Sequence, residues 1–203
     1  MMAAVEEHKR RLRQEVKLLI GELEETYCQK ADEEIYRRIL SLPEYRRADT
    51  VFCFVGTSSE IDTVPVLMDA WSRGKRVCVP KCVGKGVMNA YRIDGMEDLR
   101  EGSYGILEPG EQAVLVLPEE IDLVLAPCLS CSRDGRRLGY GGGYYDRYLG
   151  HVAAPKAVLC RSRVMREDIP VDGFDIPMDL VVCEDYVEKT AGFMRETYKM
   201  EKK

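Results

Sequence analysis

The sequence predicts one α/β domain, built on an open and mostly parallel β-sheet flanked by helices. A continuous apolar run at residues 50–55 is consistent with a strand buried on both faces, and residues 76–80 are predicted to form the next strand. A helical segment lies between them, which is the order of a βαβ unit in a parallel sheet. The chain has 203 residues, 45% of them hydrophobic and 32% charged, and this composition suits one globular domain with an ordinary core.

The N-terminal part of the chain is expected to form two helices that pack on the sheet. In the first helix an apolar residue recurs at helical spacing, at Leu12, Val16, Leu19, Ile20 and Leu23. The second helical stretch runs from Ala31 to about Leu42. It ends before Pro43, because proline disfavours the helical conformation in the residue that precedes it.

The first strand ends at Gly56, and a polar loop then leads into a helix predicted from Thr63 to Ser72. That helix ends in a basic turn followed by Gly74, which is typical of a helix C-terminus. Another helix is predicted to begin near Tyr144, after a glycine-rich segment. After the first strand, further strands are predicted at residues 76–80, 87–93, 121–127, 156–161 and 179–184.

The middle of the chain is less regular. Residues 96–100 are compatible with one or two helical turns, and residues 104–110 are rich in turn formers. The sequence contains no repeat, low-complexity linker or shift in composition that would mark a domain boundary. We therefore expect residues 1–203 to form a single domain, with a core over about 5–188 and a charged, loosely helical tail at 189–203.

The charge balance restricts the class of partner. Thirty Lys and Arg stand against 35 Asp and Glu, which gives a net charge of −5. An acidic chain is a poor candidate for a nucleic-acid or anionic-membrane binder, whose affinity depends on neutralising phosphates. Its apolar runs are too short to span a bilayer, and its start lacks the apolar region of a signal peptide. We expect a cytoplasmic monomer that acts on small molecules.

Eight cysteines call for an explanation. Half of them lie inside apolar runs, where a free cysteine behaves as a small buried hydrophobe, at Cys53, Cys78, Cys160 and Cys183. Cys128 and Cys131 have CxxC spacing, but a closed zinc site needs four ligands. The sequence offers no second CxxC and no histidine pair, since His8 and His151 are its only histidines. Incidental thiols are therefore expected there.

The residues that carry chemistry concentrate between Arg136 and Leu149. Four glycines within five positions, Gly139 and Gly141 to Gly143, follow a buried strand. They remove side chains from the backbone, so that peptide N–H groups can converge on an anion. The helix that follows points its positive end to the same place. Arg136 and Arg137 add positive charge, and Asp146 lies in the first helical turn, where it could hold a divalent cation.

Two common phosphate motifs do not fit this segment. The dinucleotide fingerprint requires glycine at position 144, which is tyrosine here. The Walker pattern GxxxxGK[ST] does not occur in the chain. The alternative to a phosphate site is a flexible glycine turn between strand and helix. The neighbouring arginines and the Tyr-Tyr-Asp sequence after the glycines favour phosphate binding.

The segment from Arg137 to Asp146 resembles the nucleotide-binding segment of the 5-formyltetrahydrofolate cyclo-ligase family, whose enzymes are also called methenyltetrahydrofolate synthetases. Three other segments resemble that family in the right order. Lys9–Arg13 resembles its N-terminal basic helix, Glu60–Thr63 its folate-contacting loop, and Asp175–Asp179 its metal-binding stretch. The resemblance covers about residues 9–185. The chain departs from the family at residues 127–132, where Cys128 and Cys131 replace a Pro-Gly segment with an aromatic residue nearby.

The resemblance implies a set of site residues. ATP would be bound by the basic segment Lys9, Arg10, Arg11, Leu12 and Arg13, and by the glycine segment Arg137, Leu138, Gly139, Tyr140, Gly141, Gly142, Gly143, Tyr144 and Tyr145. The folate would contact Thr57, Asp62 and the stretch from Tyr140 to Tyr144, and Mg²⁺ would be held by Asp146 and Asp179.

Spacing alone leaves alternatives at several of these positions. Lys9 and Arg13 lie four residues apart on one helix face, while Arg10 and Arg11 point elsewhere. Both cations could simply lay their aliphatic stems on the core. Asp62 could merely complement the N-terminus of the next helix, and Asp179 could be an ordinary residue at a strand start. Asp146 and Asp179 are expected at the same edge of the sheet.

The reaction implied by the resemblance joins ATP and 5-formyltetrahydrofolate to give 5,10-methenyltetrahydrofolate, ADP and phosphate. Phosphorylation of the formyl oxygen would create a leaving group, and no side chain is required as a nucleophile. Two other readings remain open. One is a folate- or nucleotide-binding paralogue without turnover. The other is a sugar-phosphate isomerase or CoA transferase of similar architecture, although no general base for an isomerase can be identified in the loop.

Overall fold

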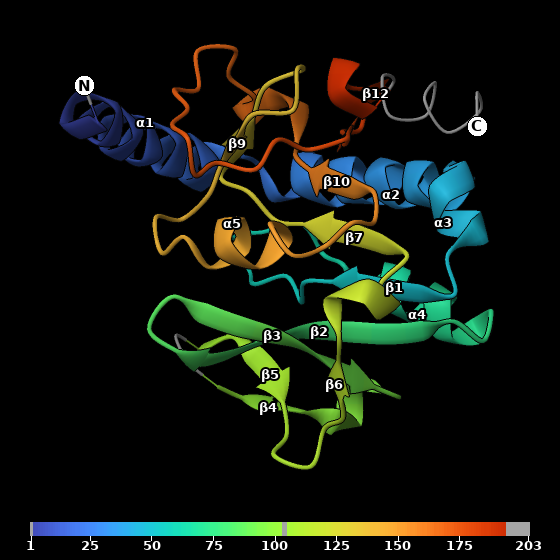
Figure 1. The fold of residues 1–203 in the computed structure, drawn as a ribbon. Coiled ribbons are helices and arrows are strands. Elements are labelled where there is room, and N and C mark those ends of the chain that lie inside the picture. The colour runs from blue at the N-terminus through green and yellow to red at the C-terminus, as the bar shows by residue number, and fades with distance from the viewer. Residues whose placement is uncertain (1, 103–104, 194–203) are drawn as a thin grey trace, which may run out of the picture.

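A computed structural model describes residues 2–102 and 105–193 of the chain (Figure 1). Its centre is an eight-stranded sheet. In spatial order the strands are β12 (Val187–Lys189), β11 (Leu180–Val182), β10 (Lys156–Leu159), β7 (Leu123–Ala126), β1 (Thr50–Cys53), β2 (Arg76–Gly84), β3 (Val87–Ile93) and β6 (Leu115–Val116). The strands from β11 to β2 are parallel, and β12, β3 and β6 run antiparallel to their neighbours. The predicted α/β fold with a mostly parallel sheet is confirmed.

The central strands are short apolar runs because both of their faces are covered. Val51 and Cys53 of β1 belong to one core and Phe52 to the other. β7 and β10 alternate in the same way, with Leu125 and Leu159 on the first face and Val124 and Val158 on the second. Side chains alternate sides along a strand, so a strand buried on both faces needs an unbroken apolar sequence.

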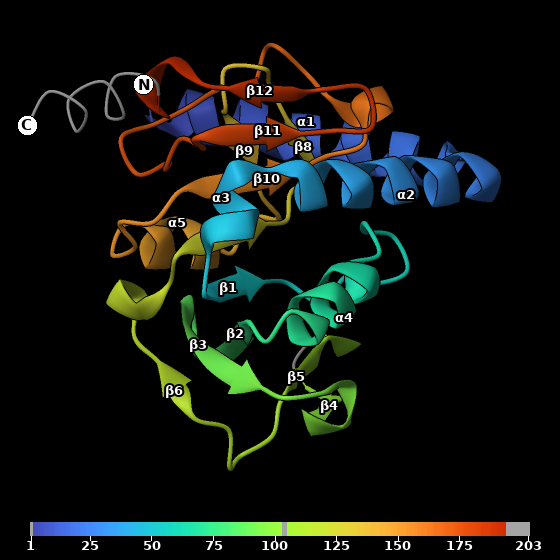
Figure 2. The same cartoon turned by 90° about the vertical axis from the view of Figure 1, so that its right-hand side faces the viewer.

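Helices cover both faces of the sheet (Figure 2). Facing the viewer in that figure are α2 (Glu25–Ser41), α3 (Pro43–Arg47) and α4 (Val64–Ser72), and on the opposite face are α1 (Met2–Glu22) and α5 (Tyr144–Leu149). Both predicted N-terminal helices are present, and Leu42 is extended ahead of Pro43 as expected. The second helix begins six residues before the predicted Ala31, at Glu25.

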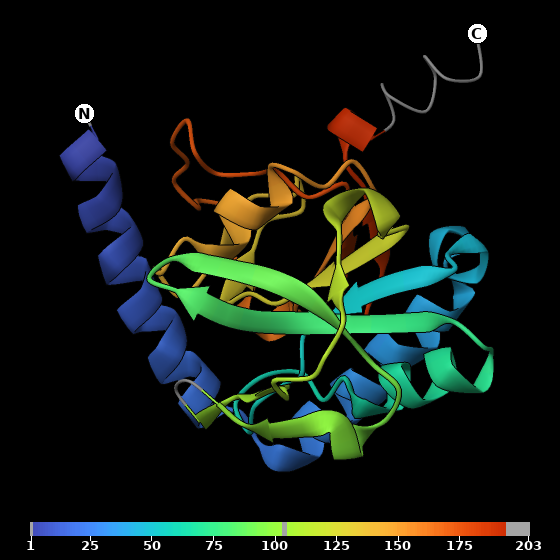
Figure 3. The same ribbon diagram turned by 60° about the horizontal axis from the view of Figure 1, so that its bottom comes forward.

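The middle of the chain differs from the sequence prediction. β2 extends to Gly84 and forms a long hairpin with β3, whose tip points to the side of the molecule where α1 lies (Figure 3). The predicted helical turns at 96–100 are a short 3₁₀ helix, Met96–Asp98, followed by β4 (Leu99–Glu101). β4 pairs with β5 (Leu107–Pro109), which lies within the segment expected to be turns.

Two further elements follow β7 and lead to the glycine segment. β8 (Ser130–Cys131) pairs with β9 (Arg137–Leu138) in a two-stranded ribbon. Much of the predicted tail at 189–203 lies outside the described residues, whereas Lys189 ends strand β12. Within the described part of the chain, no helix combines the length and apolar character needed to cross a bilayer.

Candidate active site

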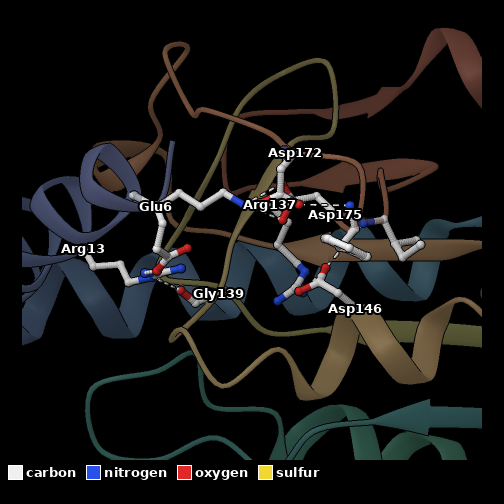
Figure 4. Close-up of polar contacts among 10 residues, drawn as sticks. Glu6, Arg13, Arg137, Gly139, Asp146, Asp172 and Asp175 are labelled. Carbon is white, nitrogen blue, oxygen red and sulfur yellow. Dashed lines mark hydrogen bonds and ion pairs between the residues drawn. The ribbon is translucent and has the colours of Figure 1, made fainter. Parts of the chain in front are cut away.

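The candidate site lies at the carboxyl edge of the parallel strands, where open α/β sheets commonly bind ligands. The loop after β1 holds Thr57 and Asp62, and the segment after β7 leads through β8 and β9 to the glycines ahead of α5. α1 approaches the same edge from the other end of the sequence (Figure 4). Contacts between these segments define the site.

Arg13 joins α1 to the glycine segment. Its Nε donates a 3.0 Å hydrogen bond to the carbonyl oxygen of Gly139, across 126 residues of sequence. A Cβ at Gly141 would lie 3.3 Å from the guanidinium carbon of Arg13, and Gly141 has a φ of +99°, which side chains rarely tolerate. Glycine at 141 therefore serves both the turn and the close approach of the cation. The structure brings together the basic helix and the glycine segment, as the sequence predicts.

Lys9 lies one turn before Arg13 but is already paired. The residue is 5% exposed, and its Nζ contacts Asp172 at 2.9 Å and Asp175 at 2.6 Å (Figure 4). Burial opposes the charge, but the two aspartates prevail and raise the pKa of Lys9 above its ordinary value. Hydrogen bonding from Lys9 in turn lowers the pKa of Asp172. Asp172 was not singled out from the sequence, because nothing local marks a partner so distant along the chain.

The other residues of the basic segment face elsewhere. Arg10 and Arg11 both pair with Glu7 on the exposed side of α1, at 2.8 and 3.0 Å. Leu12 is 3% exposed and belongs to the core beneath the helix. Within this segment the structure therefore places Lys9 and Arg13 at the carboxyl edge, on the helix face that their spacing indicates.

Arg137 is directed into the protein. Its side chain is 3% exposed, and Nη2 donates a 2.9 Å hydrogen bond to Oδ1 of Asp146. Nη1 contacts the carbonyl oxygen of Pro127 at 3.4 Å, and the guanidinium lies over the Tyr145 ring. The ion pair thus holds the Asp146 carboxylate in place, and Asp146 in turn compensates the buried charge of Arg137. The sequence could not show this inward direction, since β9 has only two residues.

Asp146 keeps one carboxylate oxygen available. Oδ1 accepts from Arg137 and, at 3.4 Å, from the backbone N–H of Ile176. Oδ2 makes no hydrogen bond within residues 2–102 and 105–193, and the side chain is 22% exposed. Ile176 follows Asp175 directly, so the chain segment that holds Lys9 also touches Asp146. Oδ2 is thus an anionic oxygen without a hydrogen-bond partner among the described residues, on a carboxylate that the Arg137 guanidinium holds in place.

Asp179 does not share this location, and the expectation of a common edge is wrong. The residue precedes β11, and its Oδ2 accepts a 2.9 Å hydrogen bond from the backbone N–H of Lys156, the first residue of β10. Because β10 and β11 are parallel, both residues lie at the amino edge of the sheet. Asp146 lies in the first turn of α5, after the segment that leaves the carboxyl end of β7. The structure gives Asp179 a strand-linking contact instead.

Arg147 anchors the glycine segment to the rest of the molecule. Its Nε donates a 2.7 Å hydrogen bond to the carbonyl of Gly86, in the turn of the β2–β3 hairpin. Its Nη2 bonds the carbonyl of Gly142. Gly143, with a φ of +64°, then starts α5. The glycine turn is therefore held from both sides, by Arg13 and by Arg147, rather than hanging free.

The loop after β1 is also internally braced. The backbone N–H and the hydroxyl of Thr57 both donate to Oε2 of Glu60, at 3.0 and 2.9 Å. Arg161 donates to the carbonyl oxygens of Ser59 and Glu60 while forming an ion pair with Asp32. These contacts set the loop's shape before any ligand arrives, and sequence spacing gave no sign of Arg161.

The loop meets the glycine segment through Tyr140. Desolvation of its phenol, together with the nearby Glu60 carboxylate, raises the pKa of Tyr140. Asp62 is exposed, and its Oδ1 accepts a 3.0 Å hydrogen bond from the N–H of Val64 at the start of α4. It thus complements a helix N-terminus, the simpler of the two roles that the sequence allows. Thr57 and Tyr140 are linked through Glu60, which accepts a hydrogen bond from Thr57 and lies beside the Tyr140 phenol.

Comparison with known proteins agrees with this geometry. The profile of the 5-formyltetrahydrofolate cyclo-ligase family matches residues 5–184. A probable 5-formyltetrahydrofolate cyclo-ligase of Schizosaccharomyces pombe is 30% identical over 196 residues, which is 88% of this chain and 96% of that protein. The 5-formyltetrahydrofolate cyclo-ligase of Escherichia coli is 29% identical over 165 residues, covering 78% of this chain and 91% of its own length.

Two solved structures share the fold. The solution structure of Aquifex aeolicus 5,10-methenyltetrahydrofolate synthetase aligns with a TM-score of 0.81 and 31% identity, over 90% of this chain and 93% of that one. The Mycoplasma pneumoniae synthetase aligns with a TM-score of 0.72 over 87% of this chain, and its 21% identity supports the fold alone. The resemblance seen in the glycine segment is thereby confirmed, and the chain belongs to the 5-formyltetrahydrofolate cyclo-ligase family of enzymes.

Proposed function

We propose that the protein uses ATP to cyclise 5-formyltetrahydrofolate to 5,10-methenyltetrahydrofolate, with release of ADP and phosphate. Family membership supports the folate chemistry. The observation that carries the use of ATP is the contact between Arg13 and Gly139, which joins a cationic helix to a turn of bare peptide groups. Such a turn, backed by positive charge, is suited to a polyphosphate.

The chemistry requires activation of a poor leaving group. Transfer of the γ-phosphoryl group to the formyl oxygen converts that oxygen into a phosphate ester and releases ADP. The N10 nitrogen then attacks the formyl carbon and loses its proton, and the carbon–oxygen bond breaks as phosphate departs. Positioning and charge stabilisation account for such a step without a protein nucleophile.

The phosphates are assigned to the two cations on α1 and to the glycine turn. Arg13 lies at the turn already, and its planar guanidinium suits bidentate contact with a phosphate. Lys9 is one helical turn away and is at present neutralised by Asp172 and Asp175. Nucleotide would compete with these carboxylates for Nζ. Arg137 is assigned a positioning role, since its side chain is buried against Asp146.

The residues present fit Mg²⁺ at Asp146. Mg²⁺ in nucleotide enzymes commonly takes one or two protein carboxylates, with phosphate oxygens and water completing its shell. Oδ2 of Asp146 suits a single such ligand, because Arg137 fixes Oδ1. Bound there, Mg²⁺ would neutralise charge on the transferring phosphates. Asp179 is not part of this proposal, because its carboxylate bonds the backbone of Lys156 at the other edge.

The folate is assigned to the loop after β1 and the facing side of the glycine turn. Thr57, Tyr140 and Tyr144 would border the bound folate, and the exposed Asp62 would lie at its rim. A pterin presents hydrogen-bond donors at fixed spacing, which carboxylates such as Glu60 and Asp62 can accept. Glu60 is added to this proposed site because it accepts a hydrogen bond from Thr57 and lies near the Tyr140 phenol.

The direct test is turnover. Purified protein is mixed with 5-formyltetrahydrofolate, Mg²⁺ and ATP, and the near-ultraviolet absorbance of the methenyl product is followed. The proposal expects product only when ATP and Mg²⁺ are both present. A folded protein that binds both substrates but forms no product would establish the non-catalytic paralogue instead. Product without ATP would contradict the phosphorylation step.

A further inference from the structure

Three cysteines from separate segments meet next to the folate loop. Cys128 follows β7, Cys131 lies in β8, and Cys160 follows β10. Their sulfur atoms all lie within 4.8 Å of one another. Among the His, Cys, Asp and Glu side chains of the described residues, this is the one group of three or more that could hold a metal ion.

The sheet register explains why the cysteines meet. β7 and β10 are parallel neighbours, and Ala126 pairs with Val158. Two residues further along each strand stand Cys128 and Cys160, so their side chains point to the same side. β8 then returns the chain across this point and adds Cys131. The CxxC pair visible in the sequence thus gains a third sulfur from a residue that sequence reading assigned to a buried strand.

The surroundings favour a soft ion over a hard one. Cys131 and Cys160 are 0% and 2% exposed, and Cys128 is half-buried. The Sγ atoms of Cys128 and Cys160 also contact the backbone carbonyl oxygens of Leu159 and Arg161. The buried apolar side chains of Leu129 and Phe54 line the same small cavity as Cys128 and Cys160. Ca²⁺ or Mg²⁺ would find no oxygen-rich shell here, whereas thiolates select ions such as Cu(I) and Zn(II).

The distances suit such an ion with little movement. A metal–sulfur bond of about 2.3 Å places three sulfurs about 3.8 to 4.0 Å apart around one centre. The sulfurs already lie within 4.8 Å of one another, so rotation of the side chains that moves each sulfur by about 1 Å or less completes the site. Half-buried Cys128 borders a narrow cleft shared with Glu60 and Arg161, which gives an ion a route in.

We propose that Cys128, Cys131 and Cys160 form a three-sulfur binding site for a thiophilic d¹⁰ metal ion, Cu(I) or Zn(II). Binding replaces three S–H protons with three metal–sulfur bonds and leaves the oxidation state of sulfur unchanged. Cu(I) is satisfied by three sulfurs in a plane, while Zn(II) requires water as a fourth ligand from the cleft. The site stands independently of the folate chemistry proposed above.

The experiment uses the full, reduced chain under anaerobic conditions, with Cd(II) as the spectroscopic probe. Wild-type protein is expected to bind one equivalent, with a sulfur-to-cadmium charge-transfer band of the strength of three thiolates. Cys128→Ser, Cys131→Ser and Cys160→Ser should each weaken binding at least about tenfold, since ligand and outer-shell losses have effects of this size or more. Cys28→Ser and Cys82→Ser, two half-buried cysteines outside the group, are the matched controls and should bind as wild type.

A second measurement avoids dependence on variants that fold poorly. The ¹¹³Cd NMR shift of the wild-type complex reports directly how many sulfurs coordinate the ion. Three-sulfur coordination supports the site. A shift typical of oxygen ligands overturns it, as does a charge-transfer band that survives all three substitutions. Wild-type protein that binds no Cd(II) under these reducing conditions would also overturn it. Competition with Cu(I) and Zn(II) chelators then separates the two ions.

Discussion

Nε of Arg13 donates a 3.0 Å hydrogen bond to the carbonyl oxygen of Gly139. The contact closes the N-terminal helix onto the glycine turn, and Asp146 and the two aspartates that hold Lys9 lie to one side of it (Figure 4). An anion placed at the turn would meet backbone N–H groups from one segment and a guanidinium from the other. The ATP proposal depends on this relationship between two residues far apart in sequence.

Arg13→Ala should weaken ATP use selectively. Hydrogen bonds to charged groups contribute about 1.5–3 kcal/mol, which corresponds to a rise in KM for ATP of about 10- to 100-fold. KM for 5-formyltetrahydrofolate should change far less. Arg11→Ala is the matched control, since Arg11 pairs with Glu7 on the exposed face of the same helix. Equal effects of the two substitutions on KM for ATP would show that the helix contributes only general charge.

Gly141→Ala should impair nucleotide binding beyond its effect on folding. The new Cβ would press on the guanidinium of Arg13 and adopt an unfavourable φ of +99°, at a cost of about 1–2 kcal/mol. Gly74→Ala is the control, because Gly74 has a φ of +73° and no atom within 4 Å of an added Cβ. Both variants should unfold at lower temperature, but only Gly141→Ala should lose ATP affinity by isothermal titration. Normal ATP affinity in Gly141→Ala would detach the turn from the nucleotide.

Asp146→Asn should raise the Mg²⁺ concentration needed for half-maximal turnover while leaving folate binding intact. It also leaves Arg137 buried without a counter-charge, so a loss of about 3 kcal/mol in stability is expected. Asp179→Asn provides the comparison, because its carboxylate bonds the N–H of Lys156. It should lower the free energy of unfolding but leave the Mg²⁺ requirement unchanged. The reverse pattern would transfer the metal to Asp179.

Removal of the Lys9 charge should change stability in a pH-dependent way. The pKa of Asp172 is lowered from 3.8, so its pairing with Lys9 stabilises the fold above about that pH and is lost on further acidification. The pKa of Lys9 is raised from 10.5, so the stabilisation persists below that value and disappears as the pH rises through the raised pKa. Denaturant unfolding of wild type and Lys9→Met across this range should differ most between the two limits. A constant difference would assign the effect to packing alone.

Much of the fold follows from local sequence. The strand around Phe52 and its parallel neighbours are continuous apolar runs, and the helix that follows the first strand ends just before Arg73 and Gly74. The glycine turn could be located as well, because each glycine, which lacks the steric limits of a side chain, is recognisable in the sequence by itself. The position of Asp179 could also have been predicted, since a residue that directly precedes a parallel strand lies at the amino edge of the sheet.

The rest depends on how distant segments meet. Lys9 pairs with Asp172 and Asp175 across more than 160 residues, and no pattern in either segment encodes that pairing. The inward direction of Arg137 depends on the two-residue ribbon that carries it. Cys160 joins the CxxC pair only because two strands are neighbours in the sheet. These contacts arise from topology, which local periodicity does not specify.

The central claim is tested most directly by a crystal structure with Mg²⁺ and a non-hydrolysable ATP analogue. We predict that the phosphates lie against the N–H groups of Gly141, Gly142 and Gly143, with the guanidinium of Arg13 in contact with them and Lys9 released from at least one of its two aspartates. A triphosphate bound elsewhere on the molecule, with no phosphate near Arg13 or the glycine turn, would contradict the proposed ATP site.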